Sequence, residues 1–159
     1  MSCQPKKILL LENIRSTHNV GAIFRTADAA GIDEIILIGE TSTPIDKYGR
    51  PRKDIAKTAL GAEQTLPYRY FTTTEEILPQ LKRDGYFLLA IEQAENSVDY
   101  KTVTPHDKIV IIMGNEVRGV NPETLSLCDQ VAEITMMGQK ESLNVAVTTG
   151  IVLFRLFNI

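Results

Sequence analysis

Three segments combine glycines with small polar side chains: "RSTHNVGAIFR" (15–25), "GNEVRGV" (114–120) and "GQKESLN" (138–144). Each follows an apolar run that has the composition of a buried strand. In an open α/β sheet, ligands bind outside the carboxyl ends of the parallel strands. Each of the three segments on its own is weak evidence. Together they predict one ligand site, built from three separate parts of the chain.

Several common chemistries have no motif in this chain. There is no G-x-x-x-x-G-K-[ST] loop, no G-x-G-x-x-G after the first apolar run, and no G-x-S-x-G turn. The two histidines, His18 and His106, have no Cys, His or carboxylate at ligand spacing, so we expect no metal. The remaining interpretation is a ligand held by backbone groups and small side chains, such as a nucleoside-containing molecule without a triphosphate.

The elements that must position these segments follow from hydrophobic patterning. Continuous runs of Ile, Leu and Val predict strands that are buried on both faces, as in a parallel sheet. The predicted strands cover 7–14, 33–39, 86–93 and 108–116, with weaker candidates at 65–71 and 130–136. The predicted helices cover 19–31, 73–85, 121–128 and 144–157. Strands that alternate with helices predict one α/β domain over 1–159, with a mostly parallel sheet flanked by helices.

Composition narrows the function classes. The 159 residues carry a formal net charge of −3, so no global field attracts nucleic acid, and any polyanion site must be local or assembled across subunits. No apolar run reaches the roughly 20 residues of a membrane span, and the N-terminal run is too short for a signal peptide. Cys3 and Cys128 form no paired motif. We therefore expect a cytoplasmic protein with free thiols.

A basic cluster and an apolar tail suggest partners. The cluster comprises Lys47, Arg50, Arg52, Lys53 and Lys57, with Tyr48 among them. Such a cluster is either a solvated face or a contact for a polyanion such as RNA, and long loops favour the contact. The tail over 144–157 is apolar on nearly every side apart from Arg155. A small domain covers such a helix on all sides only by association, so we expect a homodimer.

The three segments resemble the motifs of the SpoU (TrmH-like) branch of the SPOUT methyltransferases. "NVGAIFRTADAAG" is similar to the first motif, "IVIIMGNEVRGV" to the second and "ITMMGQKESLNVAVTTGIVLFRL" to the third, and "KTALGAE" is also similar to a family stretch. The resemblance implies a six-stranded parallel sheet with a C-terminal deep trefoil knot. It also implies methylation of ribose 2′-hydroxyls in tRNA or rRNA with S-adenosylmethionine. The chain is most similar to minimal members that act on the tRNA anticodon loop.

The resemblance also implies roles for individual residues. The catalytic set is Arg25, Asn19, Glu116, Ser142 and Asn144. The cofactor-binding set is Gly114, Asn115, Ile134, Met136, Ser142 and Leu143. Together with the basic cluster, Arg25 is expected to bind RNA. Arg25 acts either as a general base or as a group that binds phosphate and stabilises alkoxide charge, because an arginine is normally protonated.

Three alternatives stay open at this stage. Glu116 either orients Asn19 and nearby amides or pairs with Arg118 or Lys140. The enzyme class has two rivals, a SPOUT-type base methyltransferase and a non-catalytic RNA-binding protein. A core-sized enzyme with negative charge could also require an accessory protein for substrate specificity.

Overall fold

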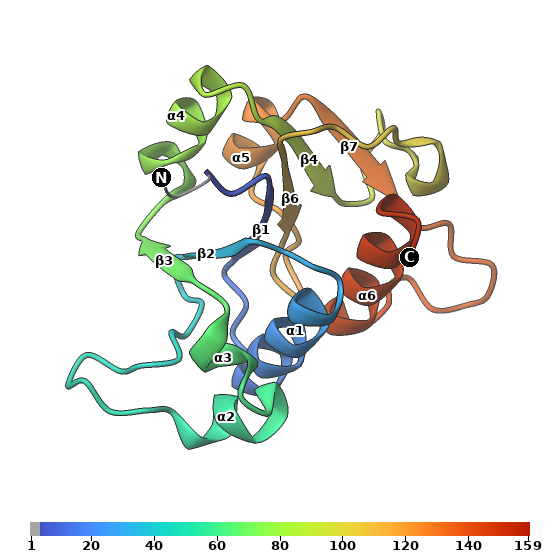
Figure 1. Ribbon diagram of the computed structural model, residues 1–159. Helices are drawn as coiled ribbons and strands as arrows, with labels where there is room; N and C mark the ends of the chain where they lie inside the picture. The colour runs from blue at the N-terminus through green and yellow to red at the C-terminus, as the bar shows by residue number, and fades with distance from the viewer. Residues whose placement is uncertain (1–3) are drawn as a thin grey trace.

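The computed structural model describes residues 4–159 and has a seven-stranded, wholly parallel sheet at its centre (Figure 1). The strands are β1 (Lys7–Glu12), β2 (Glu34–Ile38), β3 (Tyr68–Phe71), β4 (Phe87–Ile91), β5 (Val98–Asp99), β6 (Ile109–Met113) and β7 (Gln130–Glu133). Their spatial order is β3-β2-β1-β6-β4-β7-β5. The central strands β1, β2 and β6 are almost wholly apolar and buried, which explains their continuous hydrophobic runs.

Helices cover both faces of the sheet. They are α1 (Thr17–Ala29), α2 (Lys53–Ala59), α3 (Ala62–Thr65), α4 (Leu78–Arg83), α5 (Pro122–Leu127) and α6 (Val145–Leu156), with short 3₁₀ turns at Thr74–Glu76 and Tyr100–Thr102. Successive strand residues point to opposite faces, so two cores form. One core joins the sheet to α1, α2 and α6, and the other joins it to α4 and α5.

The structure confirms the α/β class, the parallel sheet and all six predicted strands. The expected count of six is wrong by one, because the two-residue β5 adds an edge strand. A segment this short has no hydrophobic period to detect. The helix expected over 73–85 is divided into a 3₁₀ turn and α4, and Pro79 lies in the first turn of α4. Helices α2 and α3 were not predicted, and the trefoil knot stays a prediction.

Cys128, directly after α5, is a free cysteine. Cys3 lies outside the described residues. The thiol of Cys128 donates to the Thr124 carbonyl oxygen at 3.2 Å, and burial raises its pKa to about 12, so this thiol packs rather than reacts. No helix within 4–159 is both long enough and apolar enough to span a bilayer.

A buried carboxylate fixes the start of α5. Glu12, at the end of β1, is 1% exposed. Its carboxylate accepts the backbone N–H of Asn121 at 2.9 Å and the hydroxyl of Thr124. The Asn121 side chain, at the N-cap position of this helix, makes no capping hydrogen bond. Burial raises the pKa of Glu12 above its ordinary value of 4.5, with the two hydrogen bonds opposing that shift.

The raised pKa predicts a pH dependence of stability. As pH rises above 4.5, the unfolded chain loses the Glu12 proton before the folded chain does, so this group lowers the free energy of unfolding until its folded pKa is passed. Glu12→Gln keeps one acceptor for Asn121 and supplies a donor for Thr124. Relative to the wild type, we expect this variant to gain stability as pH rises from 4 to 8.

Urea unfolding across this pH range measures the difference. Glu12→Ala serves as the contrasting variant, because it leaves the Asn121 N–H and the Thr124 hydroxyl unpartnered and should cost about 1–3 kcal/mol. A difference between wild type and Glu12→Gln that does not change with pH would contradict the assignment.

Candidate active site

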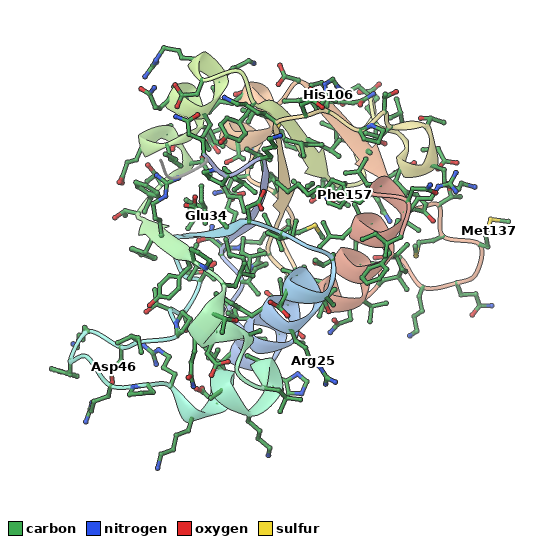
Figure 2. All side chains as sticks on the ribbon, viewed as in Figure 1. Arg25, Glu34, Asp46, His106, Met137 and Phe157 are labelled. Carbon is green, nitrogen blue, oxygen red and sulfur yellow. The ribbon has the colours of Figure 1, made fainter. Side chains whose placement is uncertain are left out.

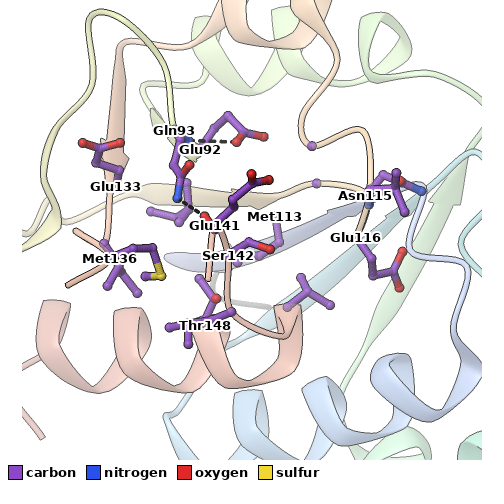
Figure 3. Close-up of a pocket in the computed structure, with 17 residues that line it drawn as sticks. Glu92, Gln93, Met113, Asn115, Glu116, Glu133, Met136, Glu141, Ser142 and Thr148 are labelled. Atoms are coloured by element: carbon purple, nitrogen blue, oxygen red, sulfur yellow. Dashed lines mark hydrogen bonds between the residues drawn. The ribbon is translucent and has the colours of Figure 1, made fainter. Parts of the chain in front are cut away.

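A cleft of about 270 Å³ opens at the carboxyl ends of β4, β6 and β7 (Figure 3). It is bounded by the turn after β6, the segment after β7 and the first turns of α6. All six residues of the predicted cofactor-binding set line it, namely Gly114, Asn115, Ile134, Met136, Ser142 and Leu143. Glu116 and Ile91 lie on the same lining. The structure therefore brings two of the three sequence segments together in one cavity, as the strand-end rule predicts.

The turn after β6 is held by its own backbone. The N–H of Asn115 donates to the Gly119 carbonyl at 3.1 Å, and the N–H of Gly119 donates back at 2.9 Å. The Asn115 side chain accepts the amides of Val117 and Arg118, each at 2.9 Å. A side chain at Gly114 would overlap the backbone of Gly119. Glycine at 114 therefore permits the close approach, and Asn115 offers a ligand mainly its backbone.

A hydrogen-bond network connects all three segments. The Asn19 side-chain amide donates to a Glu116 oxygen at 3.4 Å, and the Asn144 amide donates to the Asn19 oxygen at 3.2 Å. Glu116 also accepts the backbone N–H groups of Arg15 at 3.4 Å and Ser16 at 3.3 Å. Asn19 is 8% exposed. Asn19 therefore sits at the junction of α1, the β6 turn and the start of α6.

The same network shows which partners Glu116 has and how α6 begins. Glu116 contacts Asn19 and two amides, whereas the Arg118 guanidinium pairs with Glu40 at 2.9 Å. The side-chain oxygen of Asn144 accepts the N–H groups of Ala146 and Val147, so Asn144 is the N-cap of α6. Residues 142–144 thus lead directly into α6, and Ser142 and Leu143 also line the cleft.

Arg25 does not lie in the cleft. It is exposed on α1 and lines a separate hollow with His18, Lys57 and Phe154, and this hollow shares no lining residue with the cleft. Figure 2 shows Arg25 at the edge of the molecule beside α2. Six residues separate Arg25 from Asn19, which is roughly 240° around a helix, so the two side chains leave α1 in different directions.

The charged side chains that line the cleft are all acidic. Four carboxylates line it, those of Glu92, Glu116, Glu133 and Glu141, and none of its described lining residues is a lysine or an arginine. A cationic ligand is favoured here, and one that carries phosphate is disfavoured. No group of three His, Cys, Asp or Glu side chains within 4–159 is placed to hold a metal ion.

Glu92 and Gln93, which directly follow β4, also line the cleft and do not belong to the predicted sets. Glu92 accepts the N–H of Val120 at 2.8 Å and lies against Gly119. The Gln93 side-chain amide donates to the Glu141 carbonyl at 2.7 Å (dashed in Figure 3). Their signal was available, because polar residues directly after a buried strand face the same edge as the three segments.

The loop that accepts the Gln93 hydrogen bond is largely exposed. Residues 137–143 are exposed and project from the body beyond α6, with Met137 near the tip of the loop (Figure 2). Among the described residues, this is the one hydrogen bond that ties 135–143 to the rest of the chain. Gln93 therefore holds the segment that carries Ser142 and Leu143 against the cleft.

The basic cluster is distributed around one end of the molecule. Lys47, Arg50 and Arg52 line a hollow under the loop between β2 and α2. Lys53 begins α2, and Lys57 shares the hollow of Arg25. None of the five lines the cleft.

Comparison with known proteins identifies relatives. The model of the SpoU rRNA Methylase family matches residues 6–154. The chain is 35% identical over 150 residues to the 23S rRNA (guanosine-2′-O-)-methyltransferase RlmB of Neisseria meningitidis, covering 94% of this chain and 57% of that protein. It is 31% identical to the tRNA (guanosine(18)-2′-O)-methyltransferase of Escherichia coli K12, covering 95% of this chain and 62% of the relative. The chain thus spans about three fifths of these curated relatives.

The fold is also similar to solved structures. An AdoMet-bound rRNA methyltransferase from Sinorhizobium meliloti superposes with a TM-score of 0.87 at 32% identity, covering 99% of this chain and 58% of that one. The similarity covers the sheet and both helical layers, which are the elements that build the cleft.

The Gln93 contact predicts a change in local stability. Gln93→Ala removes the amide donor, so we expect faster cleavage by trypsin after the exposed Lys140 under native conditions and an unchanged free energy of global unfolding. A net hydrogen bond contributes about 0.5–1.5 kcal/mol, which corresponds to a roughly 2- to 12-fold increase in local opening. Glu95→Ala, an exposed neighbour, is the matched control. Equal cleavage rates in the two variants would show that Gln93 does not hold the loop.

Proposed function

The chain belongs to the SpoU rRNA Methylase family, and on that premise we propose that it methylates ribose 2′-hydroxyls in structured RNA, using S-adenosylmethionine. The observation that carries the proposal is the cleft: its walls come from the second and third motif segments, and the Asn19–Glu116–Asn144 network ties it to the first. We propose tRNA ahead of rRNA as the substrate, and the cytoplasm as the place where both meet.

The lining of the cleft suits the proposed cofactor. Ile91, Ile134 and Leu143 offer apolar contacts for an adenine ring, and backbone groups of the β6 turn offer hydrogen bonds. The surrounding carboxylates favour a ligand with a positively charged sulfonium and ammonium. When bound, S-adenosylmethionine supplies a methyl group activated by the positive charge on sulfur. Ser142 and Leu143 would hold it from the loop that Gln93 secures.

The protein must activate the ribose hydroxyl, whereas the methyl group of the donor is already activated by the positive charge on sulfur. A bond forms from the ribose oxygen to the methyl carbon as the carbon–sulfur bond breaks, and the hydroxyl proton must leave. Glu116 already accepts three N–H groups, so it positions Asn19 rather than taking this proton. Arg25 remains the candidate, either as the base or as the cation that binds an adjacent phosphate and stabilises alkoxide charge while water takes the proton.

Arg25 lines a hollow that is separate from the cleft of its own chain. We propose a homodimer in which the outer sides of α1 and α6 meet a second copy, so that Arg25 of one protomer faces the cleft of its partner. Val147 and Phe154 on α6 are 52% and 36% exposed, although the helix is apolar along most of its length. Phe154 lines the same hollow as Arg25, so covering this apolar surface would also bury the arginine.

A methyl-transfer assay tests the proposed reaction. The protein is incubated with labelled S-adenosylmethionine and total RNA, and the RNA is then separated into tRNA and rRNA and hydrolysed with alkali. A 2′-O-methyl group protects the adjacent linkage, so label should appear in alkali-resistant dinucleotides. Label on mononucleotide bases would instead indicate a base methyltransferase, and cofactor binding without transfer would indicate an RNA-binding protein or a missing accessory subunit.

Two variants distinguish a residue proposed for catalysis from one proposed for cofactor binding. Arg25→Ala should lower turnover by at least about 100-fold with little change in cofactor affinity, because both roles proposed for Arg25 act on the RNA and not on the cofactor. Leu143→Asp should weaken cofactor binding measured by calorimetry, because it replaces an apolar contact proposed for the adenine ring with a hydrated charge. Near-full methyl transfer by Arg25→Ala would exclude both roles proposed for this residue.

Light scattering tests the homodimer. Phe154→Glu places a charge in the proposed apolar interface, so we expect the dimer to dissociate to monomers at micromolar concentration and lose methyl transfer. Met137→Glu changes an apolar residue on the distal loop that is 92% exposed, against 36% for Phe154, and should remain a dimer. A wild-type protein that is monomeric throughout a dilution series would refute the interface.

A further inference from the structure

The loop between β2 and α2 is a structured projection (Figure 1). Its base is closed by hydrogen bonds from Arg52 N–H to the Pro44 carbonyl at 2.8 Å and from Asp46 N–H to the Arg50 carbonyl at 2.9 Å. The Asp46 carboxylate accepts the N–H groups of Tyr48 at 2.8 Å and Arg50 at 3.0 Å, and it pairs with the Arg50 guanidinium at 3.1 Å. These contacts, led by the Arg50 amide, hold the pKa of Asp46 below its ordinary value.

This projection carries an aromatic ring at its tip. Tyr48 is 68% exposed, and its ring lies 5.0 Å from the Lys47 ammonium and 4.9 Å from the Arg50 guanidinium. An exposed ring with cations beside it is the arrangement by which proteins stack unpaired bases and neutralise their phosphates. The Asp46 contacts fix Arg50 in place, so the ring is presented by a rigid turn.

The charges of the loop are not balanced within the chain. Two acidic side chains line the hollow under the loop, and each has a partner: Asp46 pairs with Arg50, and Glu40 with Arg118. Lys47 and Arg52 line the same hollow and form no salt bridge within residues 4–159. Two uncompensated cations therefore face one cavity in a chain whose formal net charge is −3.

Arg52 supplies an observation independent of the aromatic ring. Its Nε atom is buried and has no hydrogen-bond partner among the described residues. A buried donor left unpaired costs about 1–3 kcal/mol, so the Arg52 guanidinium would be stabilised by turning toward an acceptor such as an ordered water or a ligand. A phosphate oxygen is the acceptor for which a guanidinium is best matched.

The cavity itself has room for a ligand. The hollow is about 600 Å³, and its lining includes the hydroxyls of Ser42 and Thr43 and the ring of Tyr70, which is anchored by its hydroxyl to the Gly39 carbonyl at 2.8 Å. It shares no residue with the cleft or with the hollow of Arg25. We refer to this hollow, lined by 39–43, 45–48, Arg50, Arg52 and Tyr70, as the loop pocket.

We propose that the loop pocket binds one unpaired nucleotide of the substrate RNA, away from the nucleotide that is methylated. The base stacks on Tyr48, and the phosphate is bound by Arg52 and Lys47. This inference rests on the proposed function for the identity of the ligand. The nucleotide must be unpaired, because a base within a duplex has both faces covered by its neighbours and cannot stack on a side chain.

The sequence offers a direct probe, because the chain contains no tryptophan. Tyr48→Trp introduces a single indole at the tip of the loop, and base stacking quenches its fluorescence. Titration with a single-stranded RNA oligonucleotide should give saturable quenching, and a duplex of the same sequence should give little. Equal quenching by the two RNAs, or none by either, would overturn the proposal.

Affinity and methylation measurements provide the second test, with fluorescence anisotropy of labelled RNA as the readout. Tyr48→Ala should weaken single-stranded RNA binding by about 5- to 100-fold, and Tyr48→Phe should retain it. Arg52→Gln should weaken binding more than Lys53→Gln, a matched loss of one charge immediately outside the loop pocket. If Tyr48→Ala and Arg52→Gln bind RNA as the wild type does, the loop pocket is not a nucleotide site.

The two proposals fail in different ways. Cofactor binding should be unchanged in all five variants, because Tyr48, Arg52 and Lys53 do not line the cleft. If the wild type methylates RNA and Tyr48→Ala does so with the same KM, the loop pocket proposal is wrong and the proposed function stands. If the wild type transfers no methyl group, the proposed function fails, while the Tyr48→Trp titration still decides whether the loop stacks an unpaired base.

Discussion

The Glu116 carboxylate is the contact on which the arrangement of the candidate site depends. It follows a buried strand in the centre of the sheet and accepts two backbone amides and the Asn19 side chain from the start of α1. Asn19 in turn accepts from Asn144, the N-cap of α6. One carboxylate therefore sets the position of the first helix relative to the last, although these helices are separated by more than a hundred residues of sequence.

The chain separates its charges in space. Acidic side chains surround the cleft, and uncompensated basic side chains gather on a projecting loop and on α2. A formal net charge of −3 conceals this division. The division has a chemical logic under the proposed function, because a cationic methyl donor and a polyanionic acceptor require opposite fields. A single cavity could not favour both.

The sequence predicts the sheet and the cleft better than it predicts the periphery. Continuous apolar runs identify four strands because they are buried on both faces, whereas 65–71 and 130–136 are weaker candidates. The strand-end rule then places Gly114, Glu116 and Leu143 at one edge. The edge strand β5 and helices α2 and α3 are too short for any period to be detected. Long-range partners such as Glu12 with Asn121, or Gln93 with Glu141, have no local signature at all.

The bond from Gln93 has a consequence for how this family of sequences can diverge. It ends on the main-chain carbonyl of Glu141, which every amino acid possesses. The loop can therefore accept substitutions at 141, and at its exposed neighbours, without losing its anchor. Variation in this stretch would alter the rim of the cleft, while the donor residue itself would tolerate little change.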